Sequence, residues 1–148
     1  FSKIENLEEY TGLRCLFLEV NGILKIDGLQ NQTELRSLYL SKNLIRQIEN
    51  LDHMRFLDTL DVSHNMISKI ENLGQLSITS SRIHLFSETD MLPNFTKLII
   101  SHNKLSEIED LVHLTKCEHL SVLDIQQNYI KNPNVVEEVF AKMPSLVS

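Results

Sequence analysis

The sequence of 148 residues has little cysteine and no long apolar run. Its two cysteines, Cys15 and Cys117, fall in distant parts of the chain, so we do not expect a disulfide between them. A chain this poor in cysteine fits a reducing compartment, and we expect the cytoplasm. No stretch approaches the roughly 18 apolar residues of a membrane-spanning helix, so a membrane is not an expected partner.

The sequence also lacks the local patterns of catalysis. None of its six histidines forms the H-x-x-x-H pair of a helical zinc site, and no G-x-S-x-G or phosphate-loop motif occurs. His64 and His102 each stand in Ser-His-Asn, which favours surface residues at a sheet edge over a metal pair. We therefore expect no enzyme, no cofactor and no metal. The net charge of −6 argues against nucleic acid as the main partner.

What the sequence does contain is one pattern, L-x-x-L-x-L-x-x-N-x-I/L-x-x-I-x-x-L, repeated five times. The five units begin at Leu13, Leu35, Leu57, Phe95 and Leu120. Each unit carries an asparagine at the same place, and these are Asn21, Asn43, Asn65, Asn103 and Asn128. The pattern resembles the leucine-rich repeat, whose units stack into a solenoid. The resemblance implies binding rather than chemistry.

The start of each unit alternates apolar and polar residues, as in residues 35–40, and this period predicts a half-buried strand. One unit cannot bury its apolar side alone, so stacked units pair their strands and share one core. We expect an α/β fold, a leucine-rich repeat solenoid: a right-handed superhelix with a parallel concave β-sheet and short convex helices. The asparagine side chain can donate and accept hydrogen bonds, and we expect it to satisfy backbone groups of neighbouring turns.

The back of each unit carries a second motif, Ile-Glu-Asn-Leu, at residues 4–7, 48–51 and 70–73. Related versions stand at residues 26–29 and 108–111. The acid and the following Asn, Asp or Gly are predicted to start the short convex helix, as helix caps do.

The repeats predict a single leucine-rich repeat domain over residues 1–148, which we interpret as a fragment of a longer chain. The fourth unit starts 16 residues later than the repeat predicts, because residues 77–91 carry no repeat pattern. We interpret this insertion as a convex-side loop or a gene-model artefact, with a functional loop as the alternative. Near the end, Pro133 followed by apolar residues over 135–140 predicts an amphipathic helix.

The concave sheet is the predicted working surface, because solenoids present it for binding. Exposed Phe and Tyr beside charged residues favour a protein interface, although isolated exposed apolar residues need no explanation. The predicted partner-binding residues are Phe17, Glu19, Arg36, Tyr39, Lys42, Asp61, His64, Lys97, Ile99, His102 and Asp124.

Residues 3–16, 19–23, 32–36 and 113–124, with the shorter 131–133 and 143–146, together resemble the family of leucine-rich-repeat axonemal dynein assembly factors. The resemblance implies a cytoplasmic monomer, with the cilium or axoneme as a second location, that helps preassemble dynein arms. Its implied partners are dynein chains or assembly chaperones. Two alternatives stay open: a regulatory subunit that binds a protein phosphatase catalytic subunit, and a leucine-rich axonemal dynein light chain.

Overall fold

The structure is a computed structural model that describes residues 1–73 and 92–146. The predicted insertion at residues 77–91 lies outside the described residues. Within the described ranges, no helix is long and apolar enough to cross a membrane.

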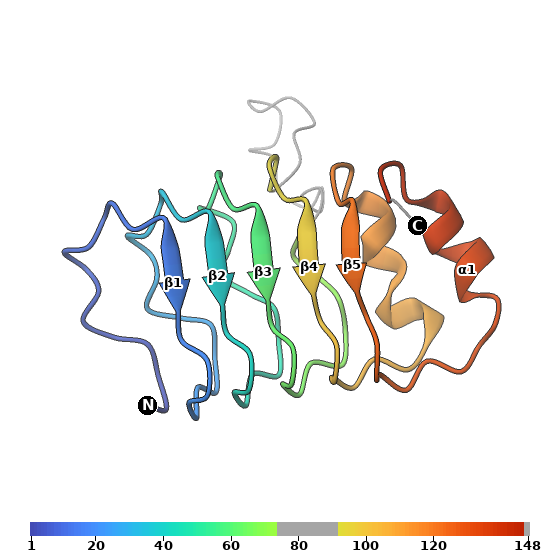
Figure 1. The fold of residues 1–148 in the computed structure, drawn as a ribbon, viewed down its shortest axis with the longest axis horizontal. Coiled ribbons are helices and arrows are strands. Elements are labelled where there is room, and N and C mark those ends of the chain that lie inside the picture. The colour runs from blue at the N-terminus through green and yellow to red at the C-terminus, as the bar shows by residue number, and fades with distance from the viewer. Residues whose placement is uncertain (74–91, 147–148) are drawn as a thin grey trace, which may run out of the picture.

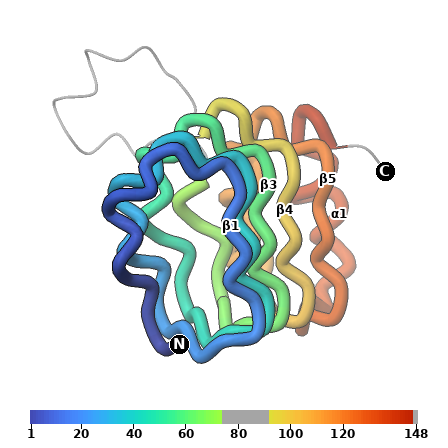
Figure 2. The backbone as a smooth tube through the Cα atoms, turned by 60° about the vertical axis from the view of Figure 1, so that its left-hand side comes forward, coloured from blue at the N-terminus to red at the C-terminus, as the bar shows by residue number. Residues whose placement is uncertain are grey.

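Within residues 1–73 and 92–146, five short strands form one parallel sheet, as the alternating pattern predicts. They are β1 (Cys15–Phe17), β2 (Ser37–Tyr39), β3 (Thr59–Asp61), β4 (Lys97–Ile99) and β5 (Val122–Asp124). The strand order in the sheet is the order in the chain (Figure 1). Figure 2 shows the coils stacked one behind the next, with all strands on the same side. The predicted solenoid is confirmed.

The middle residue of each strand is a leucine that faces the core. Leu38, Leu60 and Leu98 are fully buried and pair in register across the sheet, with Leu16 and Leu123 half-buried at its two ends. These two leucines belong to β1 and β5, each of which pairs with a strand on one side only in the described sheet. Burying each of the inner side chains contributes roughly 1.5–3 kcal/mol, so the core grows with every added coil.

The sheet continues without a break from the third unit to the fourth. Thr59, Leu60 and Asp61 pair with Lys97, Leu98 and Ile99, in the same register that joins the other strands. Backbone hydrogen bonds from Val62 N and His64 N reach into the fourth unit just as their equivalents do elsewhere. The extra residues between these units therefore leave the face of the sheet intact.

The back of the solenoid differs between units, and here part of the prediction was wrong. Asn50 and Asn72, predicted to start convex helices, have left-handed backbone with φ of 60° and 62°, and no helix follows Asn50. Their side-chain amides donate to Ile26 O and Ile48 O of the preceding coil, at 2.6 and 2.7 Å. Asparagine enters this region at low cost, so it makes a turn here rather than a helix cap.

Gly28 occupies the same slot one coil earlier, also with a positive φ of 75°. A Cβ atom at this position would overlap the carbonyl oxygen of Ile4. Glycine is therefore required twice over, by the backbone conformation and by the close approach of the neighbouring coil.

The fourth unit does have short helices on its back, η2 (Ile108–Asp110) and η3 (Val112–Lys116). Asp110 closes a capping box with Glu107, because its carboxylate accepts a hydrogen bond from Glu107 N at 2.9 Å. The motif residues thus lie inside this helix rather than before it.

The predicted C-terminal amphipathic helix exists but is short. It comprises α1 (Val135–Glu138) followed by η4 (Phe140–Lys142), with Val135 and Val139 buried against the last coil and Val136 exposed. The helix is interrupted at Val139, whose φ and ψ of −120° and −67° are not helical.

Candidate functional site

The asparagine of each unit holds the end of the strand in place. Asn65 is buried, and its amide nitrogen lies 2.9 Å from Leu40 O, 3.0 Å from Val62 O and 3.1 Å from Ser63 O. Its Oδ1 accepts a hydrogen bond from Ile45 N at 2.9 Å. One side chain therefore joins two neighbouring coils by satisfying backbone groups that the core would otherwise leave unpaired.

The other asparagines repeat this arrangement. Asn43 and Asn103 bond both to their own strand end and to the preceding coil, and Asn128 does the same while half-buried. The amide of Asn21 donates only within its own coil, and its Oδ1 accepts from Phe1 N. We call Asn43, Asn65 and Asn103, which are buried, the asparagine ladder.

The residue before each asparagine has left-handed backbone, which the sequence did not reveal. The five residues in this slot have φ between 52° and 58° and are Val20, Lys42, His64, His102 and Gln127. Non-glycine residues rarely adopt this conformation. Its occurrence in all five units shows that the chain reverses sharply at the same place in each coil. The reversal places these side chains along the rim where the strands end.

The strand side chains that point away from the core form one continuous surface, which we call the sheet face. Its central row is set by the strand register and consists of Phe17, Tyr39, Asp61, Ile99 and Asp124. Lys97 lies in the row before it and Arg36 just before β2, while Glu19, Lys42, His64 and His102 lie beyond the strand ends. None of these eleven predicted residues is buried.

Two aromatic side chains stack on the N-terminal half of the sheet face. The ring centroids of Phe17 and Tyr39 lie 4.7 Å apart with an angle of 4° between the ring planes, and Phe17 is 64% exposed. The parallel strands hold the two rings in register, so the pair is ordered before any partner arrives. An ordered aromatic group costs little conformational entropy on binding.

The two aspartates of the central row are oriented by their own chain. Asp61 Oδ1 accepts hydrogen bonds from Ser63 N at 3.0 Å and Ser63 Oγ at 2.7 Å, and Asp124 Oδ1 accepts from Gln126 N at 3.2 Å. These are Asx turns, which the Asp-x-Ser and Asp-x-Gln spacing could have suggested. Both carboxylates are half-buried on the sheet face.

His64 and His102 are also brought together, at the rim of the sheet face. Their ring centroids lie 4.0 Å apart with an angle of 12° between planes, and both side chains are exposed. Their equivalent slots in adjacent units explain the contact. In the described ranges, no group of three or more His, Cys, Asp or Glu is placed to hold a metal ion.

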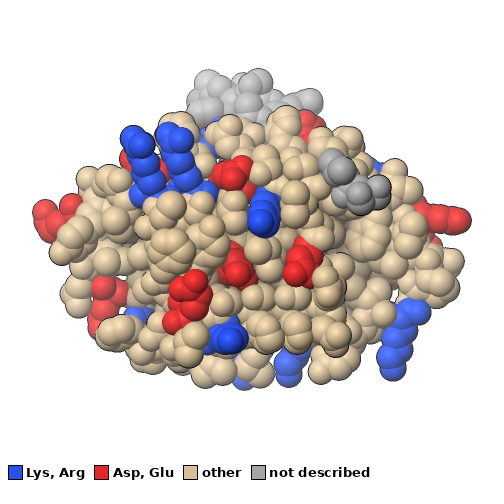
Figure 3. All heavy atoms as spheres, viewed as in Figure 1, with Lys and Arg blue, Asp and Glu red and all other residues tan. Residues whose placement is uncertain are grey.

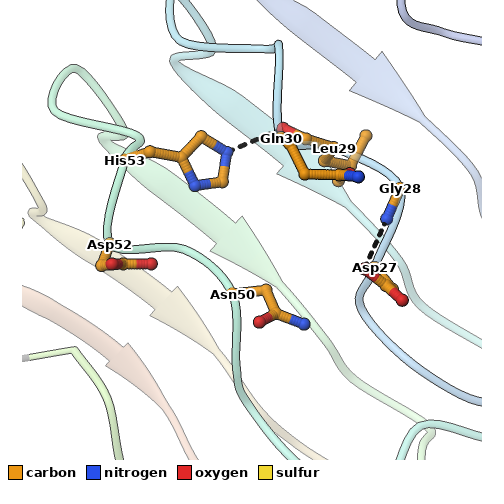
Figure 4. A pocket seen from close by; sticks show the side chains of 7 residues that line it. All are labelled: Asp27, Gly28, Leu29, Gln30, Asn50, Asp52 and His53. Atoms are coloured by element: carbon orange, nitrogen blue, oxygen red, sulfur yellow. Dashed lines mark hydrogen bonds between the residues drawn. The ribbon is translucent and has the colours of Figure 1, made fainter.

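Outside the sheet face, the turns of the first two units enclose a pocket of about 290 Å³ (Figure 4). Its lining consists of Asp27, Gly28, Leu29, Gln30, Asn50, Asp52 and His53, with no serine, threonine, cysteine or lysine. The imidazole Nε2 of His53 donates to Leu29 O at 2.7 Å. Together with the bond from the Asn50 amide to Ile26 O, this bond joins the turns of the two units.

His113 occupies in the fourth unit the position that His53 occupies in the second, but its ring accepts a hydrogen bond rather than donating one. Its Nε2 accepts a hydrogen bond from Leu73 N at 2.9 Å, so the ring is neutral there. Burial, followed by the nearby charges of Lys116 and Lys69, lowers the pKa of His113 from 6.5 to about 4. A hydrogen bond that needs the neutral ring thus joins the third and fourth units.

Comparison with known proteins gives structural neighbours only. No protein-family model and no curated protein matches the sequence. A chain of the Drosophila melanogaster SNF/U2A' complex is similar, with a TM-score of 0.67 and 26% identity, over 86% of this chain and 68% of that one. The leucine-rich repeat domain of APL1B has a TM-score of 0.59 and 19% identity, over 95% and 42% of the two chains.

The functional domain of InlJ from Listeria monocytogenes gives a TM-score of 0.58 at 23% identity, and this chain spans 25% of its length. At these identities the likeness to InlJ and APL1B shows the fold alone. The protein is accordingly a leucine-rich repeat solenoid, an architecture that presents an extended sheet to protein partners.

Proposed function

We propose that the protein is a non-catalytic scaffold that binds a protein partner through its sheet face. The observation that carries this proposal is the stack of exposed Phe17 on half-buried Tyr39, an ordered aromatic pair on a continuous five-stranded surface. Aromatic side chains are among the residues that most often dominate binding energy at protein interfaces. The charged residues that surround the pair would form the rim of such an interface.

The partner class that we propose is the machinery of axonemal dynein arm preassembly. Support comes from the sequence resemblance described above, which spans most of the chain outside residues 77–91. In this proposal the protein acts as a monomer in the cytoplasm, with the cilium or axoneme as a second location. Dynein chains or assembly chaperones are the direct partners, and the phosphatase subunit and the dynein light chain are the competing identities.

A capture experiment separates these partner classes. The wild-type protein is immobilised on beads and incubated with cytosol from ciliated cells. A Tyr39→Ala/Asp61→Lys variant, treated in the same way, serves as the comparison. Captured proteins are quantified by mass spectrometry. We expect dynein chains and chaperones on the wild-type protein and a large loss of both on the variant.

The matched control is Tyr10→Ala/Asp52→Lys. It removes an exposed tyrosine and reverses the charge of an exposed aspartate, both at positions outside the sheet face. This control should capture as much as the wild type. Capture of a phosphatase catalytic subunit without dynein would replace the leading partner class. Equal capture by all three proteins would move the binding surface off the sheet face.

A further inference from the structure

The charges on the sheet face are unevenly distributed, and this bears on the kind of partner that the proposed function would recruit. Figure 3 shows several acidic side chains and one basic side chain over the middle of the face, and two basic side chains over the strand-start end near the N-terminal coils. Along the central row, the aromatic pair of β1 and β2 gives way to Asp61, Ile99 and Asp124 on β3 to β5. The C-terminal half of the row is thus an apolar residue between two carboxylates.

Both carboxylates keep one oxygen available. Asp61 and Asp124 each use Oδ1 for a turn within their own coil. Within residues 1–73 and 92–146, neither Oδ2 takes part in a hydrogen bond, and neither aspartate is in an ion pair. A half-buried carboxylate without a cation is a better place for an incoming positive charge than a fully solvated one, since less water screens it.

Asp58, a third acid on this side of the sheet, differs because both of its carboxylate oxygens accept hydrogen bonds. One of its oxygens accepts from the Thr96 hydroxyl and the other from the Thr59 hydroxyl at 2.9 Å. It thereby ties the third unit to the fourth. The availability of Asp61 and Asp124 is therefore a property of the central row and not of every acid on this side.

The spacing of the two carboxylates sets the spacing of complementary charges. Strands β3 and β5 are two strand separations apart, which is about 10 Å. A segment in the polyproline II conformation has three residues per turn and rises roughly 3.1 Å per residue, so two side chains three residues apart lie on the same side and match this distance. Tyr39 lies one strand from Asp61 and offers a ring to a cation placed there, and Ile99 offers an apolar contact between the two charges.

The neighbouring charges allow this arrangement. Lys97 is the nearest basic residue in register, but it lies in the row of Thr59 and Val122 and forms no ion pair with either aspartate. His64 and His102 stack on each other at the rim, beyond the strand ends. The central row therefore keeps its acidic character.

We propose that the sheet face binds a basic segment of a protein partner that crosses the strands. Two arginine or lysine side chains about three residues apart bind to Asp61, beside Tyr39, and to Asp124. The remainder of the segment lies against the Phe17–Tyr39 stack. This inference rests on the proposed function, because it assumes that the sheet face is the binding surface.

A peptide titration tests the charge pattern directly. The probe is an alanine-rich octapeptide with one leucine and two arginines three residues apart, added to ¹⁵N-labelled protein and followed by NMR. We expect shifts concentrated on β3 to β5. The Asp61→Asn/Asp124→Asn variant, whose amide oxygens can still accept the two turn hydrogen bonds, should bind at least about fivefold more weakly, as expected for two partly exposed charge pairs.

Two controls make the result specific. Asp27→Asn removes a charge of the same kind on the back, where Asp27 accepts a hydrogen bond from Gly28 N, and should bind like the wild type. A peptide with glutamates in place of the arginines should bind less than the arginine peptide and should regain binding to Asp61→Lys/Asp124→Lys. Equal affinity of the wild type and the asparagine variant, or of the two peptides, would overturn the proposal.

The captured partner separates this inference from the proposed function. Loss of the partner from both Tyr39→Ala/Asp61→Lys and Asp61→Asn/Asp124→Asn supports both. Loss from the first variant alone keeps the sheet face and overturns the basic segment. Retention by both variants overturns the two together.

Discussion

The asparagine ladder and the sheet face are made by the same repeats but obey different rules. At the ladder position every unit has the same residue, and in units two to five its hydrogen bonds go to the same backbone groups of its own and the preceding coil. On the central row, the five units carry Phe, Tyr, Asp, Ile and Asp. The ladder is constrained by the backbone, which is identical from coil to coil, whereas the face meets only solvent or a partner.

This difference separates stability from recognition within one short unit. A side chain of the ladder has no freedom to vary, because backbone groups in the core depend on it. A side chain of the sheet face can change with little effect on the core. The account therefore predicts that substitutions at the two places give opposite patterns of stability and binding.

The largest stability effect is expected at the centre of the ladder. Asn65→Ala removes all four hydrogen bonds of a buried side chain and leaves Leu40 O and Ile45 N without that partner. We expect a loss of roughly 3 kcal/mol or more in the free energy of unfolding, measured by urea denaturation. The melting temperature should fall by roughly 6–12 °C.

Asn21→Ala is the matched control for that prediction. Asn21 is only half-buried, its amide bonds lie within its own coil, and its oxygen accepts from Phe1 N. We expect a cost of about 1 kcal/mol. Equal costs at Asn21 and Asn65 would contradict the argument that joining two coils is what makes the ladder important.

A pH effect of intermediate size is expected from His113. Its pKa is lowered to about 4 in the folded protein, so between pH 6.5 and 4 the unfolded chain binds a proton that the folded protein does not. The contribution of this residue to stability is present above pH 6.5 and is lost as the pH falls toward 4. The shift sets a ceiling of about 3 kcal/mol, and partial solvent exposure reduces it.

The measurement is urea unfolding of the wild type and of His113→Gln between pH 4 and 7. Glutamine can still accept a hydrogen bond from Leu73 N but does not titrate in this range. The difference between the two proteins should therefore depend on pH, with the wild type losing more stability on acidification. Parallel curves would show that His113 contributes no pH dependence.

The smallest stability effect is expected on the sheet face. Tyr39→Ala removes the stacking with Phe17, which contributes about 1 kcal/mol at a surface site, and breaks no backbone hydrogen bond. The same substitution should strongly reduce partner capture. A stability loss as large as that of Asn65→Ala would mean that the aromatic pair is part of the core rather than an interface.

Much of the fold could be predicted from the sequence, because one physical constraint recurs five times. The leucine and asparagine positions gave the strands, the core and the turns correctly. The backs of the early units were mispredicted, since Ile-Glu-Asn-Leu fits both a helix cap and a left-handed turn. Only the approach of the neighbouring coil to Asn50 or Gly28 decides between them, and that contact is not local.

For the candidate site, the sequence predicted which side chains point outward but not what they contact. The stacking of Phe17 with Tyr39 depends on a register between residues 22 positions apart. The spare oxygens of Asp61 and Asp124, against the occupied ones of Asp58, depend on hydrogen bonds between coils and within turns. Such differences arise only when the coils are assembled.

Hydroxyl-radical footprinting with and without a captured partner tests the central claim most directly. Phe17 and Tyr39 lie on the sheet face, whereas Tyr10 and Phe56, 59% and 45% exposed, lie before the strands of their units. The account predicts that the partner slows oxidation of Phe17 and Tyr39 and leaves Tyr10 and Phe56 unchanged. Protection of Tyr10 and Phe56 with continued oxidation of Phe17 and Tyr39 would contradict it.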